Sequence, residues 1–176
     1  MSLHNVTPGA KAPEEFNVII EIPMNADPIK YEVDKDSGAL FVDRFLTTPM
    51  YYPCNYGYIP RTLADDGDPV DVLVITPFAL QPGVVVTCRA LGVLMMDDEA
   101  GGDAKLLAVP TSKILPMYDH WQKIEDVNPM RIKAIQHFFE HYKDLEPNKW
   151  VKVKGWEGPE KAKSEITEGM ANYAKA

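Results

Sequence analysis

The first two-thirds of the chain alternate between apolar and polar positions with the period of β-strands. Between residues 17 and 22, Val18, Ile20 and Ile22 fall on one face, while Ile19 and Glu21 fall on the other. Further runs are rich in valine and leucine and are bounded by proline or glycine. The pattern predicts about six strands, at residues 17–22, 30–34, 40–45, 70–75, 83–96 and 105–109.

The last third changes to a helical period. Asn128 followed by Pro129 indicates an N-cap with proline at the first helical position, which predicts a helix over residues 129–143. Gly158-Pro159 opens a second predicted helix, whose narrow apolar stripe favours packing on the outside of the strands. Many short strands followed by two helices predict an α+β fold with an antiparallel sheet or barrel, in one domain spanning residues 1–176.

Charge and cysteine content limit the classes of function. Lysine and arginine total 18 against 26 acidic residues, and the net charge of −8 disfavours partners such as nucleic acid or an anionic membrane surface. Two cysteines without metal-site spacing argue against a disulfide framework or a structural zinc site. With no apolar leader at the start and no run of ~18 apolar residues, we expect a cytoplasmic protein.

The candidate chemistry is concentrated in two acidic segments. In the first, Gly67 and Pro69 block a helix and predict a loop that leads into the strand at residue 70. A solvated acidic loop is the alternative for each segment. Asp71, however, stands where an apolar strand begins, and burying its carboxylate there is costly unless it is paired or bound to a cation. The carboxylates are Asp65, Asp66, Asp68 and Asp71 in the first segment, and Asp97, Asp98, Glu99 and Asp103 in the second.

A site with only oxygen ligands selects hard cations such as magnesium or calcium. The spacing of the residues tests whether either segment could be a calcium-binding EF-hand loop. If Asp66 began an EF-hand loop, the sixth position would be Asp71 rather than glycine and the twelfth Pro77 rather than glutamate. A loop beginning at Asp97 has the glycine but ends on Ala108. Magnesium, which retains water and shares its ligation with phosphates, is therefore favoured.

Basic and hydroxyl groups supply the other half of a phosphate site. Lys30, Arg44, Glu21 and Glu32 lie on charged strand faces, although simple exposure to solvent explains such a pattern equally well. The tyrosines of residues 51–58 favour core or loop packing over ligand contacts, since such rings more often pack than bind. No Walker A loop, GxSxG elbow or GxGxxG motif occurs, which argues against the usual nucleotide-binding and acyl-transfer functions.

With these residues in place, the chain resembles the family I soluble inorganic pyrophosphatases, in their short bacterial form, from about residue 5 to 173. The segment Asp66-Gly67-Asp68-Pro69-Val70-Asp71-Val72 matches the signature of that family. Independent support comes from Glu21-Ile22-Pro23, residues 27–32, Asp43-Arg44, residues 52–57, residues 98–100, residues 103–105 and His141-Tyr142-Lys143.

The resemblance implies an OB-like five-stranded barrel with flanking helices, a homohexamer, and magnesium as cofactor, with Mn²⁺ or Zn²⁺ as possible substitutes. It implies hydrolysis of pyrophosphate to two phosphates by magnesium-activated water or hydroxide. It assigns the metals to Asp66, Asp71, Asp103, Asp98, Glu21 and Glu32. It assigns substrate binding to Lys30, Arg44, Tyr56, Lys105, Tyr142 and Lys143. Asp68 is the expected general base, with Tyr52 and Glu99 nearby.

Three other functions are open on the residues alone. A calcium-buffering domain would use the carboxylates but gives no role to Lys30, Arg44 or Lys105. A small-barrel nucleic-acid binder would use the aromatic residues for stacking but lacks a basic groove at a charge of −8. A nucleoside polyphosphate hydrolase would differ by turning over ATP under magnesium.

The predicted helix at residues 129–143 also suggests a role in assembly. Its apolar residues cover one face, and His137 and His141 lie on the opposite face, with Asp144 beside them if the helix extends that far. A solvated polar face is one interpretation. A contact between symmetry-related chains is the other, weakening in acid if the histidines pack neutral and strengthening if Asp144 pairs with them.

Overall fold

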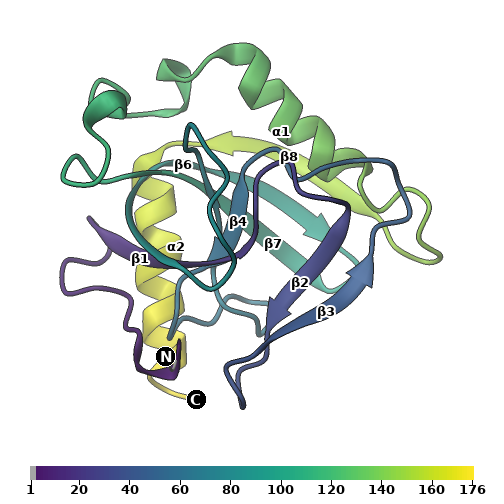
Figure 1. Cartoon of the computed structure of the whole chain (residues 1–176), viewed down its shortest axis with the longest axis horizontal. Coiled ribbons are helices and arrows are strands. Elements are labelled where there is room, and N and C mark those ends of the chain that lie inside the picture. The colour runs from purple at the N-terminus through teal and green to yellow at the C-terminus, as the bar shows by residue number, and fades with distance from the viewer. Residues whose placement is uncertain (1–2) are drawn as a thin grey trace.

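The computed structural model describes residues 3–176, so the first two residues of the predicted domain lie outside the described residues. Five strands form a closed ring in the order β1-β4-β5-β7-β6, because β6 pairs back with β1 (Figure 1). These strands are β1 (Phe16–Ile22), β4 (Asn55–Tyr58), β5 (Asp71–Val74), β6 (Val85–Asp98) and β7 (Gly101–Pro110). The ring agrees with the expected five-stranded OB-like barrel with flanking helices.

One pairing departs from the expected antiparallel pattern. β5 and β7 run parallel, because the chain crosses the ring through β6 before it returns beside β5. The other neighbours in the ring are antiparallel. The parallel register places Asp71 directly beside Lys105.

Two strands were not predicted. β4 carries only four residues between a proline-containing segment and a turn, and β8 (Val151–Glu157) alternates lysines with partly buried apolar residues. β6 is 14 residues long, and only its first part pairs with β1. β8 extends the sheet by pairing with the last part of β6. The hairpin of β2 (Ile29–Val33) and β3 (Leu40–Phe45) forms a second sheet.

Alternate residues of the ring strands belong to two hydrophobic clusters. On β5, Val72 and Val74 join the cluster that contains Ile166, whereas Leu73 joins the cluster that contains Phe138. Both faces of the strand are therefore buried, which explains its unbroken apolar run.

The two helices cover these clusters. α1 (Pro129–His141) begins as predicted, because Asn128 accepts a hydrogen bond of 2.9 Å from the backbone N–H of Met130, but it ends two residues before Lys143. α2 (Pro159–Tyr173) packs on β6, as expected from its stripe. Short 3₁₀ turns are η1 (Leu3–Asn5), η2 (Pro116–Tyr118) and η3 (Ile124–Asp126). Within the described part of the chain, no helix has the length and apolar character needed to cross a membrane.

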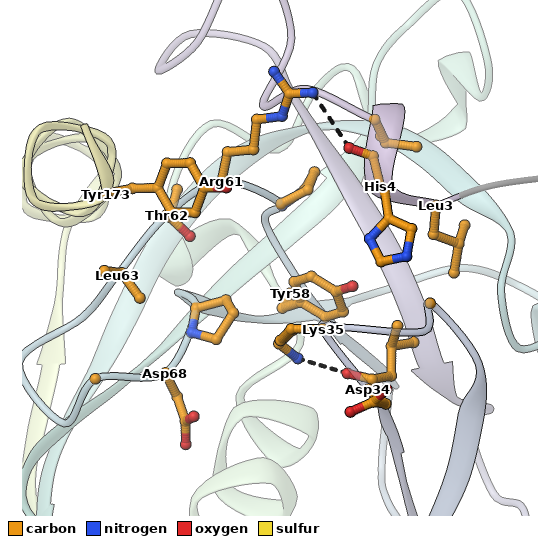
Figure 2. Close-up of a pocket in the computed structure, with 16 residues that line it drawn as sticks. Leu3, His4, Asp34, Lys35, Tyr58, Arg61, Thr62, Leu63, Asp68 and Tyr173 are labelled. Carbon is orange, nitrogen blue, oxygen red and sulfur yellow. Dashed lines mark hydrogen bonds between the residues drawn. The ribbon is translucent and has the colours of Figure 1, made fainter. Parts of the chain in front are cut away.

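A cavity of about 190 Å³ lies between η1, the turn after β2, the β4–β5 loop and the end of α2 (Figure 2). Tyr58 of β4 lies at its centre in this view, and Tyr173 approaches it from α2. The loop residue Asp68 lines the cavity as well, so the cavity adjoins the acidic loop of the candidate site.

Candidate active site

The centre of the site is a buried lysine between two carboxylates. The parallel register sets Asp71 beside Lys105, and Asp103 lies two residues before Lys105 on the same face of β7. The Lys105 ammonium is 2.5 Å from Asp71 Oδ2 and 2.7 Å from Asp103 Oδ1. It also donates a hydrogen bond of 3.3 Å to the hydroxyl oxygen of Tyr56.

The charged groups at this centre shift one another's pKa values. Burial alone lowers the pKa of Lys105, which is 5% exposed, but Asp71, Tyr56 and Asp103 raise the pKa well above its ordinary value. Burial raises the pKa of Asp103 in spite of the neighbouring ammonium. The arrangement therefore depends on a positive charge between two carboxylates.

The acidic loop before β5 is shaped by short-range hydrogen bonds. Gly67 adopts a φ of +87°, the Ala64 backbone N–H bonds to the Asp68 carbonyl at 2.7 Å, and Asp66 Oδ1 accepts the Asp68 backbone N–H at 3.0 Å. Partial burial, followed by the charges of Asp103, Asp68 and Asp71, raises the pKa of Asp66. The loop therefore brings its carboxylates close to those at the ends of β5 and β7.

The β6–β7 hairpin holds a second charged group. Lys143 is 2.8 Å from Asp98 Oδ2 and 3.5 Å from Glu99 Oε1, and Lys149 is 3.4 Å from the same Glu99 oxygen. Partial burial acts to raise the pKa of Asp98, but Lys143, the Ala100 backbone N–H and Lys105 outweigh it and leave that pKa below its ordinary value. Asp98 thus lies within electrostatic reach of the Lys105 centre.

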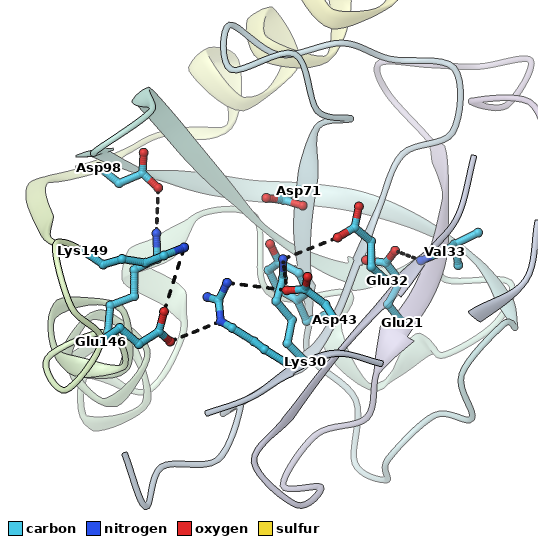
Figure 3. Close-up of polar contacts among 12 residues, drawn as sticks. Glu21, Lys30, Glu32, Val33, Asp43, Asp71, Asp98, Glu146 and Lys149 are labelled. Carbon is cyan, nitrogen blue, oxygen red and sulfur yellow. Dashed lines mark hydrogen bonds and ion pairs between the residues drawn. The ribbon is translucent and has the colours of Figure 1, made fainter. Parts of the chain in front are cut away.

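The β2–β3 hairpin provides the opposite wall (Figure 3). Lys30 is 3.1 Å from Asp43 and 3.6 Å from Glu32, and these three side chains face Asp71. Arg44 Nε is 3.2 Å from Glu146 Oε1, an ion pair whose two buried atoms are not aligned for a hydrogen bond. Arg44 is therefore held by charge without being locked in orientation.

Glu21 is the most deeply buried carboxylate of the group. It is 4% exposed and accepts a hydrogen bond of 2.8 Å from the Val33 backbone N–H. Burial raises the pKa of Glu21 to about 7. Glu21 lines a small cavity of about 50 Å³ together with Lys30, Tyr56, Asp68 and Asp71, so the barrel, the loop and the hairpin converge on one hollow.

Three buried tyrosines close the site on the side of α1. The ring of Tyr52 lies 5.1 Å from that of Tyr56 and 4.7 Å from that of Phe138, and Tyr142 stacks on Phe138. Burial raises the pKa of Tyr52, Tyr56 and Tyr142 above the ordinary value. The phenols are therefore protonated at neutral pH and able to donate hydrogen bonds to an anion.

Among residues 3–176, no three carboxylate, histidine or cysteine side chains form a ready-made metal site. The donor set nonetheless suits a hard divalent cation, because it consists of carboxylates without thiolate or imidazole. Asp71 and Asp103 already hold a positive charge, in the form of the Lys105 ammonium. The residues therefore fit magnesium, provided that Lys105 moves its ammonium away from the two carboxylates.

The residues predicted from the sequence fall into neighbouring groups. Asp68 lies on the same hollow as Glu21 and Asp71, whereas Glu99 contacts Lys143 and Lys149. Sequence reasoning missed Lys35, Asp43, Glu146 and Lys149 as site residues. Asp43 carried a signal, since it precedes Arg44 in a charged strand, but Glu146 and Lys149 stand in a turn-rich segment without one.

Comparison with known proteins agrees with this geometry. The family model described as inorganic pyrophosphatase matches residues 18–174. The inorganic pyrophosphatase of Escherichia coli K12 is 64% identical over all of this chain and 98% of its own length. That of Ralstonia nicotianae is 59% identical over 99% of this chain and 100% of its own.

Solved structures give the same result. The inorganic pyrophosphatase of Coxiella burnetii superposes with a TM-score of 0.92 at 55% identity, covering 96% of this chain and 99% of that one. A protein of Anaplasma phagocytophilum described as an inorganic phosphatase superposes with a TM-score of 0.95 at 48% identity, covering 97% and 99%. The carboxylates, the buried lysine and these matches together identify the chain as a member of the inorganic pyrophosphatase family.

Proposed function

We propose that this chain hydrolyses inorganic pyrophosphate to two phosphates in a magnesium-dependent reaction, with Asp68 as general base. The observation that carries the proposal is the Lys105 ammonium held between Asp71 and Asp103. Such a group can leave the carboxylates free for metal and carry its own charge to a phosphate. Family membership over almost the whole chain supports the same reaction.

The carboxylates divide into those that would hold the first metal and those that would serve further ions. Asp66, Asp71 and Asp103 would hold the first ion, with Asp71 also reaching a second. Further ions would be served, directly or through water, by Asp98, Asp103, Glu21 and Glu32. Magnesium bound there supplies charge that neutralises phosphate oxygens and lowers the pKa of a water molecule. The mutual charge effects among Asp66, Asp71 and Asp103 support this grouping.

The cationic and phenolic groups would bind the two phosphates. Each of these cations lies against a carboxylate, so binding a phosphate requires that it exchange the carboxylate for the phosphate. The cations are Lys30, Arg44, Lys105 and Lys143. The poor alignment of Arg44 with Glu146 favours such an exchange. Tyr56 and Tyr142 would donate hydrogen bonds through their protonated hydroxyls.

Asp68 is the proposed base for the attacking water. It is exposed, lines the same hollow as Asp71 and makes none of the described ion pairs between residues 3 and 176. A carboxylate in that position would take the proton of the attacking water, an effect typically worth ~10²–10⁴-fold in rate. Tyr52 and Glu99 would support the site from its two flanks.

Two variants separate these roles. Asp71→Asn removes charge from the metal centre, and we expect weaker magnesium binding and a loss of at least ~10²-fold in rate. Asp68→Asn is expected to lower the rate while magnesium affinity changes little. Phosphate release is measured against magnesium concentration, and a collapse of magnesium affinity in Asp68→Asn would make Asp68 a ligand instead of the base.

We further propose that the protein works in the cytoplasm as a homohexamer. Large apolar side chains at the surface of the single chain support a role in assembly, among them Phe45 at 68%, Phe78 at 79% and Met130 at 70% exposed. His137 and His141 lie exposed on α1, and His141 Nδ1 is 2.8 Å from Asp144 Oδ2. Sedimentation at neutral pH is expected to give six times the chain mass, and a monomer at micromolar concentration would contradict the proposal.

A further inference from the structure

The cavity of about 190 Å³ beside the barrel is separate from the hollow that Glu21 and Lys30 line, but the two share a wall. Lys35, Tyr58, Asp68 and Pro69 line both of them. A molecule bound against this part of the larger cavity therefore touches residues that also border the candidate active site. Asp68, the proposed base, is one of these residues.

The floor of the cavity is apolar. Val33 is 2% and Tyr58 is 6% exposed, and Pro60, Leu3 and Val6 complete this side. A dry cavity of about 150 Å³ is large enough to bind benzene, so this volume accommodates one substituted aromatic ring. It is too small for a nucleotide.

The rim of the cavity is polar and carries two cations. Among residues 3–176, neither Lys35 nor Arg61 has a carboxylate within ion-pair distance. Lys35 donates to the Val33 carbonyl at 2.9 Å and lies 4.4 Å from the centre of the Tyr58 ring. Arg61 donates one hydrogen bond of 3.2 Å to the His4 carbonyl. Its other guanidinium N–H groups make none of the hydrogen bonds described for this part of the chain.

Acidic groups on the lining do not cancel the charge of Arg61, whereas Lys35 also acts on Glu21 across the shared wall. Asp34 accepts both the backbone N–H and the hydroxyl of Ser37, at 2.8 Å and 2.5 Å, through the same oxygen. Asp68 points away from the centre of the cavity (Figure 2). The Arg61 guanidinium therefore favours an anionic group at its end of the rim.

The backbone at Arg61 is a further sign of a functional site. Arg61 adopts a φ of +56°, in the left-handed region that few residues other than glycine and asparagine occupy. Such a conformation is unfavourable for a residue with a side chain and persists where the surrounding structure imposes it. Here it directs a guanidinium to the rim of the cavity (Figure 2).

We propose that this cavity is an accessory site for a small molecule with one aromatic or heteroaromatic ring and one anionic group, and that occupancy changes the rate of the neighbouring active site. The ring lies on Tyr58 and Val33, and the anionic group faces Arg61. Because Tyr58, Pro69 and Asp68 form the shared wall, the bound ring restricts the loop that carries the base. The effect on rate therefore appears at saturating pyrophosphate.

The test uses benzoate as the probe and Arg61→Asn as the variant, both with the full-length protein. Asparagine tolerates the left-handed region, so the variant removes the guanidinium without new backbone strain, and its Tm is measured to confirm folding. Arg61→Gly gives the same comparison with the least restricted residue. Lys113→Asn, an exposed lysine away from the cavity, is the matched control.

Saturation-transfer NMR is expected to show millimolar binding of benzoate to the wild type and to Lys113→Asn. Arg61→Asn should bind about tenfold more weakly, as for loss of one hydrogen bond to a charged group. Benzyl alcohol, which lacks the charge, and acetate, which lacks the ring, should bind more weakly than benzoate. Benzoate should also change the rate of phosphate release at saturating pyrophosphate, and this effect should be lost in Arg61→Asn.

Other outcomes overturn the proposal. Equal binding of benzoate to wild type and to the Arg61 variants would show that the cavity is not the site. Inhibition that disappears as pyrophosphate is raised, and that is unchanged in Arg61→Asn, would place benzoate on the phosphate-binding cations instead. Absence of binding at millimolar benzoate would equally rule the site out. The proposed reaction itself would stand in all three cases, because it is measured without benzoate.

Discussion

Replacing Lys105 with methionine separates the structural and catalytic roles of the charged centre. The ammonium lies 2.5 Å and 2.7 Å from two carboxylates and is 5% exposed. Removing one partner of a buried charge pair typically costs ~3–5 kcal/mol, because the remaining charges are left without compensation. For a chain of this size that corresponds to a fall in Tm of roughly 6–20 °C in EDTA.

Magnesium should reverse most of this loss. Without the ammonium, Asp71 and Asp103 have no competing cation, so we expect Lys105→Met to bind magnesium more tightly than the wild type and to gain more stability from it. Activity should nevertheless fall by ~10²-fold or more, since the group proposed to neutralise phosphate charge is gone.

The assay is thermal unfolding at fixed protein concentration, in EDTA and across a magnesium titration, with phosphate release measured on the same samples. Lys113→Met, at an exposed lysine, is the control and should change stability by less than ~0.5 kcal/mol. Equal destabilisation of Lys105→Met with and without magnesium would refute the reasoning, because it would mean that no metal replaces the ammonium.

Two further predictions concern the fold and the thiols. A Cβ at Gly57 would overlap the Ile19 carbonyl and lie 2.9 Å from Ile20 Cα, so Gly57→Ala should lower the free energy of unfolding by at least ~3 kcal/mol in chemical denaturation. In the control Gly102→Ala, the nearest atom to the new Cβ is 3.9 Å away, and the loss should be under ~1 kcal/mol. Similar denaturation midpoints for the two variants would contradict this. Burial raises the pKa of the Cys54 thiol to about 11 and that of the Cys88 thiol above its ordinary value. Both thiols of the native protein should therefore resist iodoacetamide at pH 8 until the protein is unfolded. Rapid labelling of either thiol in the native state would be inconsistent with their burial.

Periodicity, capping and turn residues were sufficient to predict the elements whose structure depends on neighbouring residues in the sequence. The alternation at residues 17–22 predicts β1, and Asn128-Pro129 predicts the start of α1. Gly67 and Pro69 predict the acidic loop, because no helix or central strand tolerates both. The family signature then supplied roles that alternation and charge had left open.

Long-range pairing accounts for what could not be predicted. β4 and β8 are strands because neighbouring strands offer them hydrogen bonds, and neither has a strong pattern of its own. The parallel register of β5 with β7 decides that Lys105 lies between Asp71 and Asp103, and no local pattern contains that register. Glu146 reaches Arg44 only because the segment after α1 folds back onto the β2–β3 hairpin.

Hydrolysis of pyrophosphate by this chain should depend on metal held by its carboxylates. The most direct measurement is phosphate release from pyrophosphate by the purified protein, with magnesium and with EDTA, and with ATP as the competing substrate. We predict rapid release from pyrophosphate that depends on magnesium, and much slower release from ATP. Release that persists in EDTA, or a preference for ATP, would contradict the account.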